Sequence, residues 1–264
     1  MRNVSFAALL LALALAPAPA GAQPKGAPPQ AAPQQAPGQK PYKPVAVKLP
    51  PILNDPSLDA FRKEVTAVAQ RKDRAALARM LVAKGFFWER EDGKGADDAK
   101  SGLDNLAAAL NLGADDGSGW NALAKAVSDA HASADPQRKD VVCAPAPPGV
   151  DEKDFEALAQ ATSTEPIDWG FPNAPGVEVR SAPRPDAPVV EKLGLVLIRA
   201  AEETPMSALE GTSPDWVHIV TPSGKVGYVP STAMSPLVAD QICYLKEAGD
   251  WKIAGIVGGG GDQQ

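Results

Sequence analysis

The feature that most constrains this chain is a change in the spacing of apolar residues after Trp169-Gly170-Phe171. Before this point, apolar residues recur three and four positions apart, which is typical of helices buried on one face. Over residues 177–229 they alternate with polar residues in short runs separated by proline and glycine, which is typical of β-strands. The sequence therefore predicts an α+β protein, with a mainly helical N-terminal domain followed by a small β-domain.

Five helices are expected within residues 53–164. Asp55-Pro56 marks the first start, because aspartate caps helices and proline is tolerated at the first helical position. Three consecutive aromatic residues at 86–88 indicate a short extended segment that anchors the core. The helices are expected at about 56–70, 73–84, 96–112, 118–132 and from Asp151 onward.

Short strands are expected in the last third of the chain. Residues 215–220 and 225–229 flank Thr221-Pro222-Ser223-Gly224, which is a hairpin signal, and further strands are expected at 177–179, 189–190 and 195–198. A second hairpin, from 242–245 and 251–256, follows this β-domain.

These segments together resemble the bacterial SH3 (SH3b) family of small β-barrels found in secreted proteins. The resemblance covers roughly residues 174–237, and the polar loop at 201–214 is longer than is usual in the family. It is carried by Val179, Arg180, Pro183, the Pro188-Val189-Val190 run, Trp216 and the closure from Gly224 to Gly227-Tyr228-Val229. It implies an SH3-like β-barrel over residues 165–257, with the second hairpin as an addition to it.

The resemblance also implies a binding site. SH3b barrels recognise cell-wall peptides or short extended segments through a groove lined by aromatic and loop residues. Its candidate counterparts here are Trp216, Tyr228 and the loop that begins at Arg180, with Trp251 included if the added hairpin borders the groove. Packing within the barrel is the alternative role for Trp216 and Tyr228.

The first 22 residues have the features of a cleavable secretory signal peptide. Arg2 provides the positive start, residues 6–16 the apolar run, and Ala20-Gly21-Ala22 a small-residue cleavage site. No later stretch reaches the ~18 apolar residues of a spanning helix, and no cysteine follows the cleavage site for a lipid anchor. We therefore expect a periplasmic or secreted protein without stable membrane insertion after cleavage.

Residues 23–52 are rich in proline, glutamine and alanine, with nine prolines among residues 23–51. Such a composition buries too little apolar surface to offset the entropy of ordering, so a disordered linker is expected. Residues 258–264 are expected to form a flexible tail.

Two cysteines are present, Cys143 and Cys243. Disulfides persist in the oxidising compartments to which a signal peptide leads, so we expect the two to pair. Closing a loop of this length stabilises the folded state by roughly 4 to 5 kcal/mol in the chain-entropy model. The bridge would then join the β-barrel to the segment that leaves the helical domain; two buried free thiols are the alternative.

The charge of the chain is uneven. The net charge is −6, but residues 1–52 contain no acidic residue, so residues 53–264 carry 21 basic against 32 acidic side chains. An acidic body argues against nucleic acid as a partner.

The sequence offers little catalytic chemistry. An imidazole mechanism would have to use His131 or His218, each of which is expected to be a surface or packing residue. Cys143 precedes a proline-rich segment and not a helix that would activate a thiolate. The aspartate pairs at 97–98 and 115–116 lack the alternating ligands of a calcium loop. We therefore predict no catalytic residue, no metal site and no cofactor.

Three hypotheses follow. The first is a non-catalytic exported envelope protein whose SH3b-like module binds a cell-wall peptide or a protein segment. The second is an interaction or structural subunit whose helical domain binds a partner protein. The third is a cell-wall hydrolase that uses Cys143 and a histidine, which a disulfide would exclude.

Overall fold

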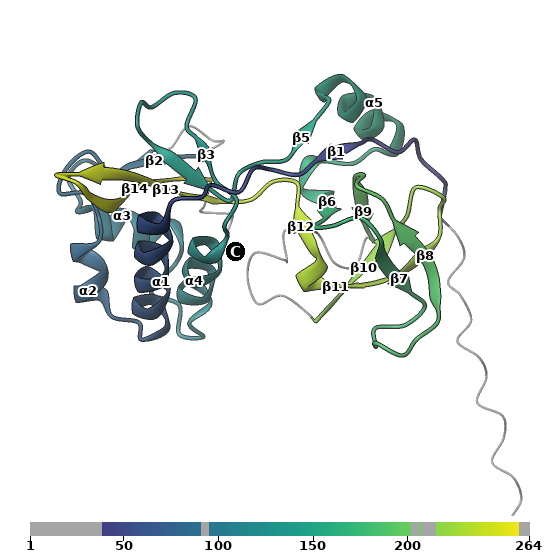
Figure 1. Cartoon of the computed structure of the whole chain (residues 1–264), viewed down its shortest axis with the longest axis horizontal. Coiled ribbons are helices and arrows are strands. Elements are labelled where there is room, and N and C mark those ends of the chain that lie inside the picture. Colours follow the sequence, from purple (N-terminus) through teal and green to yellow (C-terminus); the bar gives the residue numbers. More distant parts are fainter. Residues whose placement is uncertain (1–38, 91–94, 202–205, 207–214, 259–264) are drawn as a thin grey trace, which may run out of the picture. The chain divides into compact units, whose positions relative to one another are not determined.

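The structure is a computed structural model that describes residues 39–90, 95–201, 206 and 215–258 (Figure 1). The predicted signal peptide, residues 23–38 of the predicted linker and residues 259–264 of the predicted tail lie outside the described residues. Helices and strands are both present, so the α+β prediction is confirmed. Within the described part of the chain, no helix is long and apolar enough to cross a membrane.

The first helix, α1 (Pro56–Gln70), begins where the sequence predicts it. The Asp55 carboxylate accepts hydrogen bonds from the backbone N–H groups of Ser57 and Leu58, which have no partner within the helix. A hydrogen bond from the Ser57 hydroxyl, followed by that from the Leu58 N–H, holds the pKa of Asp55 below its usual value. The other helices are α2 (Arg74–Arg79), α3 (Gly102–Ala109), α4 (Ser118–Ser128) and α5 (Glu152–Thr162).

Helix α2 is shorter than predicted, because the chain after it pairs with a strand. The Ile253 N–H donates to the Met80 carbonyl at 2.8 Å, and the Val82 N–H donates to the Ile253 carbonyl at 3.0 Å. These backbone bonds to a segment 170 positions away replace the last turns of the predicted helix. Helix α3 is also shorter than predicted. It begins after Ser101, whose hydroxyl accepts a hydrogen bond from the Asp104 N–H and so caps the helix.

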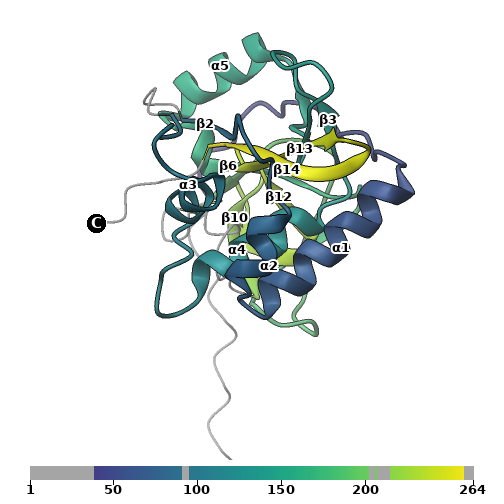
Figure 2. The ribbon, with the colours of Figure 1, turned by 90° about the vertical axis from the view of Figure 1, so that its left-hand side faces the viewer.

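A five-stranded sheet lies against these helices (Figures 1 and 2). Helices α1, α2 and α4 lie on one side of it in both views. Strands β2 and β14 are parallel, and the other neighbours are antiparallel. In spatial order the strands are β2 (Phe87–Glu89), β14 (Asp250–Val257), β13 (Gln241–Glu247), β4 (Val142–Ala144) and β3 (Ser133–Ala134).

The second hairpin, β13–β14, forms as predicted, but its place in the fold was predicted wrongly. It belongs to the sheet of the N-terminal part and is not an addition to a barrel. Ile242, Tyr244 and Ile253 pack with helix residues such as Leu58 and Leu123 in one buried cluster. The helices need this partner because their apolar faces would otherwise be left in water. Residues 53–164 therefore do not make a helical domain by themselves.

The predicted disulfide between Cys143 and Cys243 is present. The two residues lie opposite each other on β4 and β13, so the bridge joins neighbouring strands of one sheet. It does not join a barrel to the helical part, as we expected from the hairpin's position in the sequence. The bridge instead fixes the C-terminal hairpin to the strand that leaves the helices.

A seven-stranded antiparallel sheet contains the remaining strands of the last third. Its two end strands, β12 and β8, are not neighbours in the described sheet, so no closed barrel is formed. In spatial order the strands are β12 (Met234–Pro236), β6 (Trp169–Pro172), β9 (Ile198–Ala200), β10 (Trp216–Val220), β11 (Val226–Pro230), β7 (Val177–Arg180) and β8 (Val189–Leu193).

Residues 39–52 are ordered, in contrast to the disordered linker predicted for 23–52. Tyr42, Val45 and Val47 are buried in a cluster with Trp169. The Tyr42 hydroxyl donates to the Val220 carbonyl at 2.8 Å. Strand β1 (Val47–Lys48) pairs with β5 (Gly149–Val150). The proline-rich composition of the segment concealed these alternating apolar residues, which pack on elements distant in the sequence.

One buried polar group has no partner among the described residues. The Tyr244 hydroxyl lies in the core between α1 and the five-stranded sheet. The Phe61 ring packs edge-on against the tyrosine ring there, with the two ring centroids 6.2 Å apart. Burial raises the pKa of Tyr244, so the hydroxyl stays neutral. An unpaired buried hydroxyl costs roughly 1 to 3 kcal/mol.

Removing the disulfide is expected to lower stability substantially. The Cys143→Ala/Cys243→Ala variant should lose about 2 to 5 kcal/mol of unfolding free energy, since a loop of about 100 residues is no longer closed. Urea denaturation with and without reductant measures the difference. Reductant should lower the stability of the parent protein and leave the double variant unchanged; equal midpoints for all samples would contradict this role.

The two buried tyrosines should respond in opposite ways to loss of the hydroxyl. Tyr244→Phe should leave stability unchanged or raise it by about 1 kcal/mol, because the lost hydroxyl had no partner. Tyr42→Phe should lower it by about 1 kcal/mol, because the Val220 carbonyl loses its donor. Chemical denaturation of both variants tests this, and a larger loss for Tyr244→Phe than for Tyr42→Phe would show the assignment to be wrong.

Candidate functional site

The outer face of three neighbouring strands carries most of the predicted binding residues. His218 on β10 is the register partner of Tyr228 on β11, and Tyr228 is the partner of Arg180 on β7. Trp216 lies two residues from His218, on the same face of β10. We call Arg180, Trp216, His218 and Tyr228 the aromatic face.

Alternation along each strand produces this face. Val217, Ile219 and Val229 are 0% exposed and form the core of the seven-stranded sheet. Their neighbours along the strands, Trp216 and Tyr228, are half-buried on the opposite side. Because part of such a ring is already exposed, a ligand can contact its apolar surface without any rearrangement of the sheet. The two rings therefore lie on the outer surface of the sheet and not in its core, and Tyr228 packs there against His218.

The rings of His218 and Tyr228 are stacked. Their centroids are 4.5 Å apart, and their planes meet at 12°. Cross-strand aromatic pairs of this kind stabilise a sheet and also present a flat surface. The sequence predicted His218 as a surface or packing residue. The hairpin signal at residues 221–224 does not specify the register of the two strands, so it did not identify Tyr228 as the partner of His218.

Arg180 is held beside the stack by neighbours on its own strand and loop. Its Nη1 donates to the Ala187 carbonyl at 2.7 Å, and its Nη2 donates to Glu178 Oε2 at 2.5 Å. Lys192 Nζ lies 3.3 Å from the other oxygen of Glu178. The guanidinium is therefore preorganised, and it ties the loop at 181–188 to the edge of the sheet.

Glycine at position 227 allows β7 to approach β11 closely. A Cβ at this position would lie 2.6 Å from Val179 Cγ1 and 2.7 Å from the Arg180 carbonyl oxygen. The pairing that aligns Arg180 with Tyr228 therefore requires a residue without a side chain here.

Trp251, the fourth predicted binding residue, lies outside the aromatic face. It is on β14 in the five-stranded sheet, and its Nε1 donates to the Ser57 hydroxyl at 2.9 Å. Lys246 Nζ lies 4.8 Å from the centre of its ring. Trp251 was predicted as a binding residue only if the added hairpin bordered the groove. Because the hairpin belongs to the five-stranded sheet, this condition is not met.

The residues considered for catalysis are not brought together. Both cysteines form the disulfide, so neither is available as a thiol nucleophile. His131 Nδ1 lies 2.8 Å from Asp129 Oδ1, near the end of α4. His218 lies on the seven-stranded sheet. No conventional Cys–His pair can therefore form.

The aspartate pairs serve local structure. Asp97 accepts a hydrogen bond from the Ala99 N–H. Asp116 accepts one from the Ser118 N–H, and this bond holds the pKa of Asp116 below its usual value. Neither pair is among the groups in the described residues that could hold a metal ion; the group found there is Asp135, Cys143 and Cys243.

A recess lined by residues distant in the sequence was not predicted from the sequence. It has a volume of about 320 Å³ and is mostly apolar, with exposed Leu49 and Val238 among its lining residues and His131 in its wall. Leu49 and Val238 are 189 positions apart in the sequence, and no local pattern links the lining residues.

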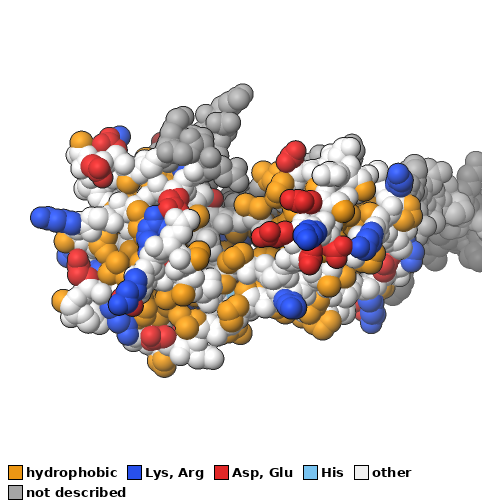
Figure 3. Space-filling model, turned by 90° about the horizontal axis from the view of Figure 1, so that it is seen from above, with side chains coloured by type: hydrophobic (Ala, Val, Ile, Leu, Met, Phe, Trp, Pro, Cys, Tyr) orange, Lys and Arg blue, Asp and Glu red, His pale blue; other side chains and the backbone are white. Residues whose placement is uncertain are grey.

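The charged side chains near α5 are mixed in sign. Figure 3 looks down on the side of the molecule that bears α5 and shows acidic and basic side chains interspersed over it. One such pair is Lys43 and Asp154, whose Nζ and Oδ1 atoms are 2.7 Å apart. Such a surface favours mixed polar contacts over binding of a polyanion.

No family model matches the chain, and no curated protein or solved structure matches it significantly. The resemblance to the SH3b family therefore stays a prediction from the sequence.

A pair of glycine substitutions tests the close approach of β7 and β11. Gly227→Ala should lower stability by about 1 to 3 kcal/mol, because the added methyl group meets backbone and a packed valine. Gly194→Ala is the matched control, since a Cβ there has no atom within 4 Å, and should change stability by less than about 0.5 kcal/mol. Equal midpoints in urea denaturation would contradict the described packing.

Proposed function

We propose that this chain is a non-catalytic exported protein of a bacterial envelope that binds a cell-wall peptide or an extended protein segment through the aromatic face. The observation that carries the proposal is the alignment of Trp216, the His218–Tyr228 stack and Arg180 on one outward side of three adjacent strands. A flat aromatic surface beside Arg180 and Lys192, which share the single carboxylate of Glu178, suits an extended peptide that carries a carboxylate.

The fold assigned to this module is also a proposal. Strands β7 to β11 lie at or beside the strands expected at residues 177–179, 189–190, 195–198, 215–220 and 225–229, and the β10–β11 hairpin turns at Gly224. We propose that the seven-stranded sheet is an SH3-like barrel that stays open between β12 and β8. The family's peptide-binding role supports the assignment of the aromatic face.

Localisation outside the cytoplasm is part of the same proposal. The first 22 residues have the composition of a signal peptide, and the disulfide suits an oxidising compartment. We propose a periplasmic or secreted protein that needs no cofactor.

The alternative in which the N-terminal part binds a partner protein, while the β-domain only stabilises it, makes a different prediction. In that case substitutions on the aromatic face would leave binding of the partner protein unaffected. The hydrolase alternative lacks a free thiol among the described residues, because both sulfur atoms are bonded to each other.

Sedimentation with purified peptidoglycan tests the proposed function. The parent protein should pellet with the wall material, and Trp216→Ala and Tyr228→Ala should each weaken binding at least ~5-fold, since truncating an aromatic anchor costs more than about 1 kcal/mol. Trp251→Ala is the matched control, because this tryptophan lies on the other sheet, and it should bind like the parent.

Circular dichroism of each variant separates loss of binding from loss of fold. Parent protein that stays in the supernatant would overturn wall binding. Equal binding by Trp216→Ala, Tyr228→Ala and Trp251→Ala would overturn the assignment to the aromatic face.

A further inference from the structure

Cys143 and Cys243 are held opposite each other by the sheet as well as by their bond. Their Cα atoms are 4.0 Å apart, and the flanking residues pair in the same register, Ala144 with Ile242 and Val142 with Tyr244. Strand β13 is also paired along its other edge with β14. Backbone hydrogen bonds on both sides therefore keep the two side chains adjacent when the bond between the sulfurs is broken.

A carboxylate is placed against these sulfurs. Asp135 Oδ2 lies 3.8 Å from Cys143 Sγ, and the aspartate side chain is only 5% exposed. A disulfide sulfur carries no proton, so this contact is not a hydrogen bond in the oxidised protein. The other oxygen of the aspartate holds the side chain in place. Asp135 Oδ1 accepts hydrogen bonds from the backbone N–H groups of Gln137 at 2.6 Å and Arg138 at 2.9 Å.

The three side chains form one compact donor set. Their ligand atoms all lie within 4.8 Å of one another, in a spot where both cysteines are less than 5% exposed. Thiolates and a carboxylate are ligands that zinc accepts in tetrahedral sites, in which three protein groups leave a fourth position for water. We propose that reduction of the disulfide converts Cys143, Cys243 and Asp135 into a Zn²⁺ site.

The chemistry balances with a dithiol as the reductant. The dithiol transfers two electrons and two protons to the bridge, becomes a disulfide itself, and leaves thiols on Cys143 and Cys243. Zinc then displaces one proton from each thiol and binds the two thiolates, releasing two protons to solvent. The oxidised chain cannot bind zinc in this way, because sulfurs bonded to each other are not thiolate ligands.

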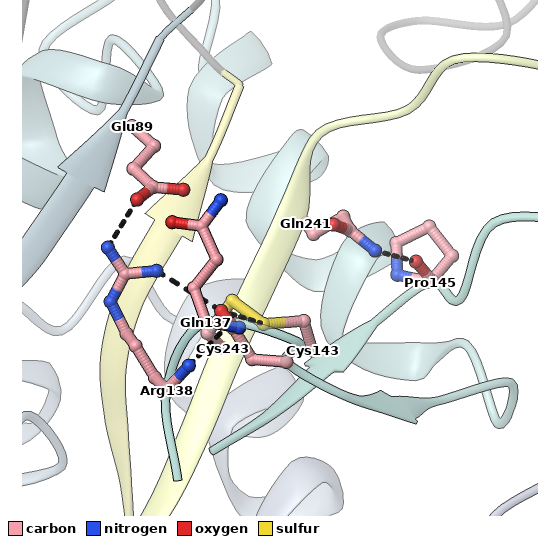
Figure 4. Close-up of a disulfide and its surroundings, with 8 residues drawn as sticks. Glu89, Gln137, Arg138, Cys143, Pro145, Gln241 and Cys243 are labelled. Atoms are coloured by element: carbon pink, nitrogen blue, oxygen red, sulfur yellow. Dashed lines mark hydrogen bonds and ion pairs between the residues drawn. A yellow bond between two sulfur atoms is a disulfide. The ribbon is translucent and has the colours of Figure 1, made fainter.

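The surrounding charges suit the loaded site. Two thiolates and one carboxylate bring three negative charges to a doubly charged cation, so one negative charge remains. Arg138 lies next to the site, with Nη1 3.2 Å from Asp135 Oδ2, and its Nη2 pairs with Glu89 (Figure 4). The guanidinium lies between the remaining negative charge of the site and the Glu89 carboxylate and is attracted to both, and the backbone bonds to Asp135 orient its carboxylate.

The full chain with its disulfide reduced provides the test. The protein is reduced with a dithiol, freed of reductant without oxygen, and titrated with Co²⁺, which absorbs visibly when bound tetrahedrally by thiolates. The expected result is a sulfur-to-cobalt charge-transfer band that saturates at one ion per chain, release of two protons per ion, and loss of the band when Zn²⁺ is added. Oxidised protein and the Cys143→Ala/Cys243→Ala variant should give no band.

A matched pair of aspartate variants tests the third ligand. Asp135→Asn keeps an oxygen for the two backbone donors and should weaken Co²⁺ binding by the reduced chain at least ~10-fold. Asp140→Asn, at an exposed neighbouring position, should change it less than twofold. Equal affinities for the two variants would overturn the site, as would absence of the band in reduced parent protein that keeps its circular dichroism spectrum. A charge-transfer band that appears only when the reduced chain has unfolded would also overturn the site, because the folded sheet would then not be what holds the cobalt ion.

Discussion

The fold depends on the pairing of strand β13 with β4, which brings residues 241–247 beside residues 142–144. Cys243 lies opposite Cys143 in this pairing, and the disulfide fixes it covalently. Ile242 and Tyr244 on the same strand then cover the apolar sides of the helices. In the sequence, the strands of the seven-stranded sheet thus lie between two segments that share one core. Neither of these segments can bury its apolar residues without the other.

This arrangement gives the two sheets different roles. The five-stranded sheet carries the bridge and the ion pairs of Arg138 with Asp135 and Glu89, and its helices cover one side. The seven-stranded sheet presents the aromatic face and holds Arg180 in place through Ala187 and Glu178. Its core is separate from that of the helices, so substitutions on its outer surface should leave the part of the molecule that the disulfide stabilises undisturbed.

Local signals in the sequence predicted local structure well. Asp55-Pro56 marked the start of α1, and alternating apolar residues marked the β10–β11 hairpin. The grouping of Trp216, Tyr228 and Arg180 came from the resemblance to the SH3b family and not from a local signal. The predictions failed where the outcome depended on a distant partner. Alternation shows which side of a hairpin is apolar but not which sheet it joins, so the hairpin and Trp251 were assigned to the wrong sheet.

The most direct test of the central claim is hydrogen exchange of backbone amides in the native protein. If the C-terminal hairpin completes the core of the helices, amides of β13 around residues 242–244 should exchange only through global unfolding, with the same free energy of opening as those in the middle of α1. Exchange of the hairpin at a much lower free energy than α1 would show that it opens separately, and would contradict the account.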